Sequence, residues 1–199
     1  MGNFAATRGA GLGPATNPVA QLYRTKDNQA KTLRAFGNVF AEVDIIEGLT
    51  GRSSVGFDYT NTNRVNYVLM DREEAEIEAA NSMTKANVND INLTWTNTLN
   101  YKKVFNEIHS ISALAGTEAI KGSGEDFSAV RTTYFSEDPD FMDLNSGTAG
   151  INNTGSRYEW ALFSIFGKVN YSLKDKYLLE ATVRRDGSSR FGSNNRYGT

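Results

Sequence analysis

The chain has 199 residues, of which 39% are hydrophobic and 22% charged, with a formal net charge of -2, one histidine and no cysteine. This composition argues against a nucleic-acid-binding surface, which needs clustered positive charge, and it excludes disulfides and thiolate metal sites. No stretch approaches the roughly 18 consecutive apolar residues of a spanning helix. A transmembrane β-barrel escapes that test, because only every second residue of its strands faces lipid.

Residues 1–30 are rich in Gly, Ala, Thr and Asn, and we predict a loop segment there. Gly9, Gly11 and Gly13 form no phosphate cradle, because neither Gly-Lys-Ser nor Gly-Lys-Thr follows them.

The next stretch predicts two antiparallel strands joined by a short turn. From Leu33 to Ile45 every odd residue is apolar or glycine, and the even residues are largely polar. A turn at 48–51 leads to a second alternating run at 53–59. Residues 61–90 are then predicted to be a long polar loop, with a short strand extension at 67–70 and one acidic helical turn within 71–80.

The alternation is clearest in a third predicted strand, at 91–102, where the even residues are all polar. A turn at 104–107 leads to a fourth strand at 110–119. Residues 121–156 are predicted to be a second long loop, and it contains the acidic run Ser136-Glu-Asp-Pro-Asp140.

The chain closes with a predicted hairpin of two strands, at 161–172 and 177–184, around a turn at 173–176. The predicted fold is therefore all-β, an antiparallel meander of about six long strands over residues 31–199. Short turns alternate strictly with long loops, so all the short turns should lie at one end of the sheet. That asymmetry and the strand length are typical of large transmembrane β-barrels.

Tyrosines and tryptophans weakly support the same prediction. Tyr101, Tyr171 and Tyr177 lie near the short turns, and Tyr59 and Trp160 near the long loops, as aromatic girdles at two membrane interfaces would require.

A soluble, secreted β-sandwich that binds carbohydrate is the alternative, since alternation also fits a sheet with one side in water. The sandwich requires the apolar rows to pack against a second sheet, whereas the barrel directs them outward. The residues that decide are Ile91, Leu93, Trp95, Phe163 and Ile165.

No catalytic, cofactor-binding or metal-binding residue is assigned, and we predict that the chain is not an enzyme. His109 has no second histidine or cysteine beside it and is predicted to be an exposed strand-end residue. The acids Glu137, Asp138, Asp140 and Asp143 are interpreted as solvated loop charges, with a loop cation site as the weaker hypothesis. The cluster Arg184, Arg185, Asp186 and Arg190 is predicted to form internal pairs at a strand end, with contact to a ligand or lipid headgroups as the alternative. Inward candidates for a plug or substrate path are Arg34, Glu42, Asp44, Glu118, Lys168 and Glu180.

Several runs resemble the SusC/RagA family of TonB-linked outer-membrane proteins. They are NPVAQLYRTKDN (17–28), NTLNYKKVF (97–105), SALAGTEA (112–119), YFSEDPD (134–140) and FGKVNYSLKDKYLLEATVRRDGSSRFGSNNRYGT (166–199). The resemblance implies an internal barrel fragment of a cell outer-membrane TonB-dependent receptor that imports a nutrient, either an oligosaccharide or a peptide. It also implies contact with outer-membrane lipid, extracellular loops at 61–90 and 121–156, and two partners, a SusD-like surface lipoprotein and the TonB complex. Since residues 1–20 do not form a secretory signal, the chain is expected to be a piece of a longer protein.

Overall fold

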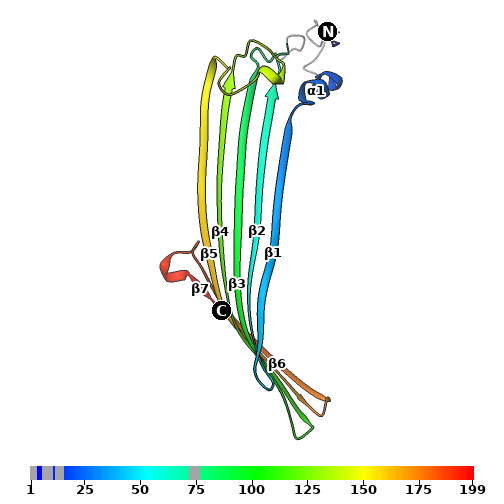
Figure 1. Cartoon of the computed structure of the whole chain (residues 1–199), viewed down its shortest axis with the longest axis vertical. Helices are drawn as coiled ribbons and strands as arrows, with labels where there is room; N and C mark the ends of the chain where they lie inside the picture. Colours follow the sequence, from blue (N-terminus) through cyan, green and yellow to red (C-terminus); the bar gives the residue numbers. More distant parts are fainter. Residues whose placement is uncertain (1–3, 6–10, 12–15, 72–76) are drawn as a thin grey trace. The chain divides into compact units, whose positions relative to one another are not determined.

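The computed structural model describes residues 4–5, 11, 16–71 and 77–199. Seven strands form one sheet in the order β1 to β7, so each strand pairs with the next one in the chain (Figure 1). The elements are α1 (Pro18–Thr25), β1 (Gln29–Ile46), β2 (Leu49–Val68), β3 (Ser82–Phe105), β4 (His109–Thr132), η1 (Pro139–Phe141), β5 (Ala149–Leu173), β6 (Tyr177–Ser188), η2 (Ser193–Asn195) and β7 (Tyr197–Gly198).

The predicted meander of long strands is confirmed. β5 and β6 pair antiparallel with Leu173 opposite Tyr177 and Leu162 opposite Ser188, which is the predicted hairpin. β7 is a short addition of two residues, and it pairs with Asp186 and Gly187 of β6.

The prediction of a loop throughout residues 1–30 is wrong for α1. The helix begins after Asn17, whose side-chain Oδ1 accepts hydrogen bonds from the backbone N–H groups of Val19 at 2.9 Å and Ala20 at 3.3 Å. Pro18 follows at the first helical position, where its missing N–H costs nothing. The Asn-Pro pair is thus a helix-start signal that the composition of the segment obscured.

The bounds predicted for the two long loops are also corrected. β2 runs on to Val68, β3 starts at Ser82, β4 runs on to Thr132 and β5 starts at Ala149. The loops shrink to 69–81 and 133–148. Asn61, Asn63 and Asn87 place hydrogen-bonded amides on the odd-numbered face, which is apolar elsewhere. The sequence there therefore lacks the sustained apolar–polar contrast that would mark a strand. Within the predicted acidic helical turn, residues 72–76 lie outside the described part, and Asp71 and Glu78 form an antiparallel bridge.

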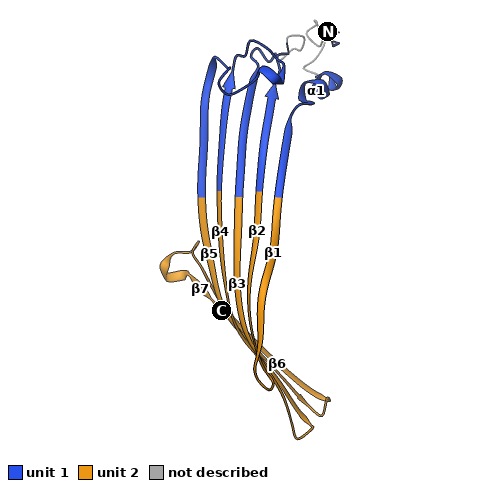
Figure 2. Ribbon diagram, in the orientation of Figure 1, with its two compact units in different colours: residues 1–33, 61–89, 125–157 blue, residues 34–60, 90–124, 158–199 orange. Residues whose placement is uncertain are grey.

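The chain divides into two units, coloured separately in Figure 2: residues 1–33, 61–89 and 125–157, and residues 34–60, 90–124 and 158–199. The first unit contains a small hydrophobic cluster of the buried residues Met83, Tyr134 and Met142. Asn81 fixes this cluster, because its amide donates to the Tyr134 carbonyl at 3.1 Å and its Oδ1 accepts from the Tyr134 N–H at 2.7 Å. The two remaining loops are therefore tied to each other within this unit.

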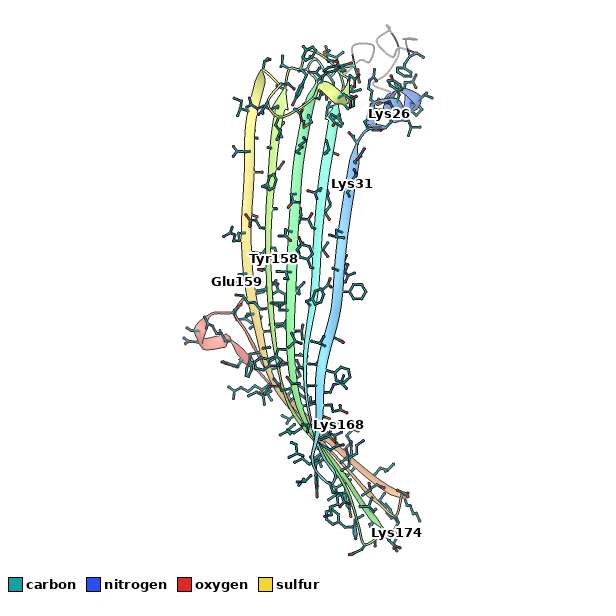
Figure 3. The ribbon with its side chains drawn as sticks, in the orientation of Figure 1. Lys26, Lys31, Tyr158, Glu159, Lys168 and Lys174 are labelled. Carbon is teal, nitrogen blue, oxygen red and sulfur yellow. The ribbon has the colours of Figure 1, made fainter. Side chains whose placement is uncertain are left out.

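The second unit is a single layer without a core. None of its hydrophobic side chains is buried, and all of its residues are among those described. Its side chains project from both faces of the sheet (Figure 3).

Candidate functional site

The candidate site is the two-faced sheet of the second unit. Its odd-numbered face is apolar and uncovered: Leu93, Trp95, Phe163 and Ile165 are each 44% to 55% exposed, and Ile91 is half-buried. No second sheet covers them in the part of the chain that the structure describes, since all the strands belong to one sheet. This arrangement is the one that the barrel hypothesis requires and the sandwich hypothesis excludes.

The length of the apolar row matches a membrane crossing. On β5 it extends from Ala161 to Leu173, which is about 40 Å along an extended strand at roughly 3.3 Å per residue. A strand tilted by about 45° converts that length into about 28 Å of depth, close to the apolar band of a transmembrane barrel. A soluble monomer seldom leaves so continuous an apolar surface in contact with water.

The short turns lie beside one another, as predicted. The N–H of Lys102, near the end of β3, donates to the carbonyl of Gly48 in the first turn at 2.7 Å. Lys174 in the last turn donates to Ile108 in the middle one at 2.8 Å. Gly48 has a φ of +82°, and a Cβ there would lie 2.3 Å from the carbonyl oxygen of Lys102. Only glycine suits this position, both in conformation and in space.

The even-numbered face carries ion pairs between neighbouring strands. Arg34 binds Asp58 at 2.7 Å, Arg52 binds Glu42 at 3.4 Å, and Lys168 binds Glu180 at 2.8 Å. Asp44 accepts a hydrogen bond from Thr50 at 2.7 Å. Exposed pairs of this kind contribute only about 0–1 kcal/mol each. Their main effect is to make this face hydrophilic, and it includes the predicted inward residues.

Only part of the arginine cluster forms the predicted internal pairs. Arg184 binds Asp186 at 2.7 Å, as predicted, but it also binds Glu118 of β4 at 2.8 Å and Ser164 of β5 at 2.8 Å. Arg185 and Arg190 instead stack on aromatic rings, with guanidinium carbons 5.1 Å and 5.0 Å from the centres of the Tyr197 and Trp160 rings. These partners could not be predicted from proximity in the sequence, because they lie on other strands.

The same two aromatic rings, those of Trp160 and Tyr197, pack over glycines. A Cβ at Gly122 would lie 2.3 Å from the Trp160 ring, and one at Gly187 would lie 2.5 Å from the Tyr197 ring. Each ring thus covers a glycine on the adjacent strand while an arginine stacks against it. Aromatic coverage of strand glycines stabilises curved sheets, because it fills the space that the missing side chain leaves.

His109 is half-buried, not exposed as predicted. Its Nδ1 lies 2.7 Å from the Tyr171 hydroxyl, and the two rings stack at 6.0 Å. The histidine therefore links β4 to β5 beside the short turns.

The acidic loop residues have structural contacts. Glu137 accepts from the N–H of Met70 at 2.5 Å, Asp138 caps η1 by accepting from Asp140 N–H at 3.1 Å, and Asp143 binds Lys85 at 3.3 Å. Among the described residues, no group of three or more potential ligands is arranged to hold a metal ion. In the same described part, no helix is long and apolar enough to cross a membrane.

Comparisons with known proteins agree with this geometry, although no family model matches the chain. TonB-dependent receptor P39 of Formosa agariphila is 31% identical over 187 residues, which cover 92% of this chain and 17% of the relative. TonB-dependent receptor SusC of Bacteroides thetaiotaomicron is 58% identical over 38 residues, or 19% of this chain. The chain is similar to the SusC-like TonB-dependent receptors.

Solved structures show a similar likeness for this SusC-like chain. The RagAB peptide importer in its closed-closed state superposes with a TM-score of 0.79 at 29% identity, over 88% of this chain and 20% of the matched one. The RagAB peptide transporter gives a TM-score of 0.78 at 30% identity, over 86% and 19% of the two chains. The resemblance seen in the sequence is thus confirmed. The SusC-like chain spans about a fifth of the length of the relatives it matches.

Proposed function

We propose that this SusC-like chain forms part of the wall of a transmembrane β-barrel in the outer membrane, within a TonB-dependent transporter that imports a nutrient. The single layer with an uncovered apolar face carries the proposal. In lipid that face is favourably placed, and its strand hydrogen bonds are satisfied within the sheet. In water the same face would be a large exposed apolar patch.

The hydrophilic face would line the interior of the barrel. Its cross-strand ion pairs keep charged groups partnered while leaving them accessible to a plug or a passing substrate. The outer strands β1 and β7 have one unpaired edge each in the sheet order. Unpaired backbone groups are costly in hydrocarbon, so further strands of the longer protein would complete the barrel.

The end with the tied loops 69–81 and 133–148 would be extracellular, because outer-membrane barrels have short periplasmic turns and longer extracellular loops. A SusD-like surface lipoprotein would meet the protein there, and an inner-membrane TonB complex would act from the other side. The substrate would be an oligosaccharide or a peptide. Support for a peptide comes from RagAB, a peptide transporter, and support for the lipoprotein from the likeness to SusC.

Two adjacent residues of β5 test the orientation of the sheet. Val169 lies on the apolar face and is 49% exposed, and Asn170 lies on the hydrophilic face. The full-length receptor would carry a bimane label at Val169→Cys or Asn170→Cys and be reconstituted in vesicles of brominated phospholipid. Bromine should quench the label at 169 and leave the label at 170 bright. Equal quenching, or a receptor that fails to enter vesicles, would contradict the proposal.

A further inference from the structure

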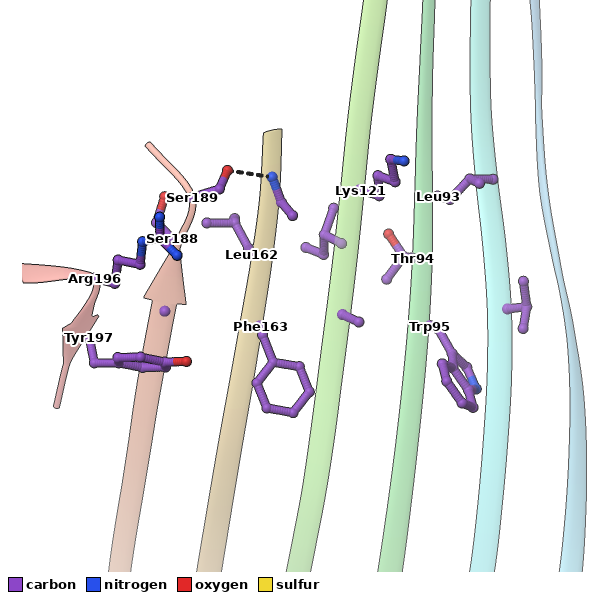
Figure 4. Close-up of a pocket in the computed structure, with 15 residues that line it drawn as sticks. Leu93, Thr94, Trp95, Lys121, Leu162, Phe163, Ser188, Ser189, Arg196 and Tyr197 are labelled. Atoms are coloured by element: carbon purple, nitrogen blue, oxygen red, sulfur yellow. Dashed lines mark hydrogen bonds between the residues drawn. The ribbon is translucent and has the colours of Figure 1, made fainter. Parts of the chain in front are cut away.

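An apolar groove of about 600 Å³ crosses the odd-numbered face of the second unit. Leu93, Trp95 and Phe163 line one part of it, and Ser189, Arg196 and Tyr197 line its polar end (Figure 4). The groove lies on the face proposed to contact lipid. Its lining residues come from β2 to β7, so the groove extends across the strands.

Two arginines without a carboxylate partner lie at or beside the polar end: Arg196 lines the groove, and Arg185 stacks on the ring of Tyr197, which lines it. Among the residues that the structure describes, neither Arg185 nor Arg196 forms an ion pair. Arg185 stands opposite Ile165 in the β5–β6 register and stacks on the Tyr197 ring. The Nε of Arg196 donates only a long hydrogen bond, 3.4 Å, to the carbonyl of Phe191.

The position of these charges calls for an anion. Arg185 continues the odd-numbered row of Tyr177, Leu179, Ala181 and Val183, which is apolar. Arg185 also lies opposite Ile165, inside the apolar row of β5, and a cation there is costly unless it reaches a headgroup or a counter-ion. Hydrocarbon beside two guanidinium groups without a carboxylate partner is complementary to an anionic phospholipid.

We propose that this groove binds an anionic phospholipid, one whose headgroup phosphate is not neutralised by a cation of its own, with an acyl chain along Leu93, Trp95 and Phe163 and the phosphate between Arg185 and Arg196. The Ser189 hydroxyl supports this arrangement. Its oxygen accepts a hydrogen bond from the Ala161 N–H at 2.8 Å, so its own hydrogen is free to donate to a phosphate oxygen. The inference rests on the membrane location proposed above.

The test uses the full-length receptor, purified in detergent and supplied with phosphatidylglycerol or phosphatidylcholine with identical acyl chains. Native mass spectrometry counts the bound lipids. The variant is Arg185→Gln/Arg196→Gln. Lys103→Gln is the matched control, because Lys103 is an exposed cation of the same face that also stacks on an aromatic ring, Phe105, at the short-turn end. A third variant, Ala119→Phe, fills the floor of the groove.

The unsubstituted receptor should retain phosphatidylglycerol over phosphatidylcholine by about tenfold, the effect of one charge-assisted hydrogen bond. The double variant should lose that preference, Lys103→Gln should keep it, and Ala119→Phe should weaken the binding of both lipids. Excess glycerol 3-phosphate should fail to displace the lipid, because it lacks an acyl chain.

Equal retention of the two lipids, an unchanged preference in the double variant, or displacement by glycerol 3-phosphate would overturn the lipid site. If the receptor still enters vesicles in those cases, the proposed membrane function survives. A receptor that does not enter vesicles at all overturns both proposals.

Discussion

Replacing Val39 by arginine tests the lipid-facing assignment of the odd-numbered rows. Val39 is in the middle of the apolar row that runs from Leu33 to Ile45 on β1, and it is 73% exposed. The substitution therefore removes almost no protein contact. Any large loss of stability must come from placing a charge in the surroundings of the sheet.

The expected loss of stability depends on how deep each residue lies in the membrane. Ile45 follows Val39 by six positions, or about 20 Å along the strand, which a tilt of about 45° reduces to about 14 Å of depth. That is about half of the roughly 30 Å hydrocarbon thickness, so Val39 lies near the midplane and Ile45 near an interface. Val39→Arg should lower the free energy of unfolding by about 2–4 kcal/mol, and Ile45→Arg by about 0–1 kcal/mol.

Asn38→Arg is the matched control, because Asn38 is exposed on the hydrophilic face one residue away. It should change the stability by less than about 0.5 kcal/mol. The measurement is urea unfolding of the full-length receptor in phospholipid vesicles, followed by heat-modifiable electrophoretic mobility. A cost at Asn38 equal to that at Val39, or no cost at Val39, would refute the assignment of faces.

Three further predictions concern the turns and the loop cluster. Gly48→Ala should destabilise the receptor by about 1–3 kcal/mol in the same unfolding assay, because the residue has a positive φ and the added Cβ meets a backbone oxygen. Gly192→Ala is the control and should be neutral, because a Cβ there meets nothing within 4 Å. Asn81→Ala leaves the buried N–H and carbonyl of Tyr134 unpaired. Amide hydrogen exchange in residues 133–148 should therefore accelerate by an amount that corresponds to a loss of about 2–4 kcal/mol in local stability. Unchanged exchange would contradict the role of Asn81. Burial raises the pKa of Tyr134 in the folded protein. The neutral phenol therefore contributes its full stability at pH values below the ordinary tyrosine pKa of about 10. That contribution is lost as the pH rises through the higher pKa of the folded state. The difference in tyrosinate absorbance between the receptor and Tyr134→Phe should show one tyrosine that titrates late, and titration at the ordinary pH would disprove the effect of burial.

The local pattern of the chain determined the strands that have one apolar face. Alternation from Leu33 to Ile45 and from Ile91 to Tyr101 defines a face without reference to any partner, and glycine or turn residues mark the short connections. The meander and the clustering of its short turns follow from these elements alone, because antiparallel neighbours reverse direction at every turn. The runs that resemble SusC/RagA proteins could likewise be identified from the sequence alone.

Tertiary structure decided the features that depend on which distant residues meet. The strands extend through Asn61–Val68 and Ser82–Asn89 because backbone pairing with the adjacent strand holds them, although their side chains show no apolar–polar contrast. Arg184 finds Glu118 on another strand, and Arg185 finds the Tyr197 ring. Above all, alternation cannot say what covers an apolar face. Periodicity is a property of one strand, whereas burial is a property of everything packed around it, and here the sheet leaves that face open.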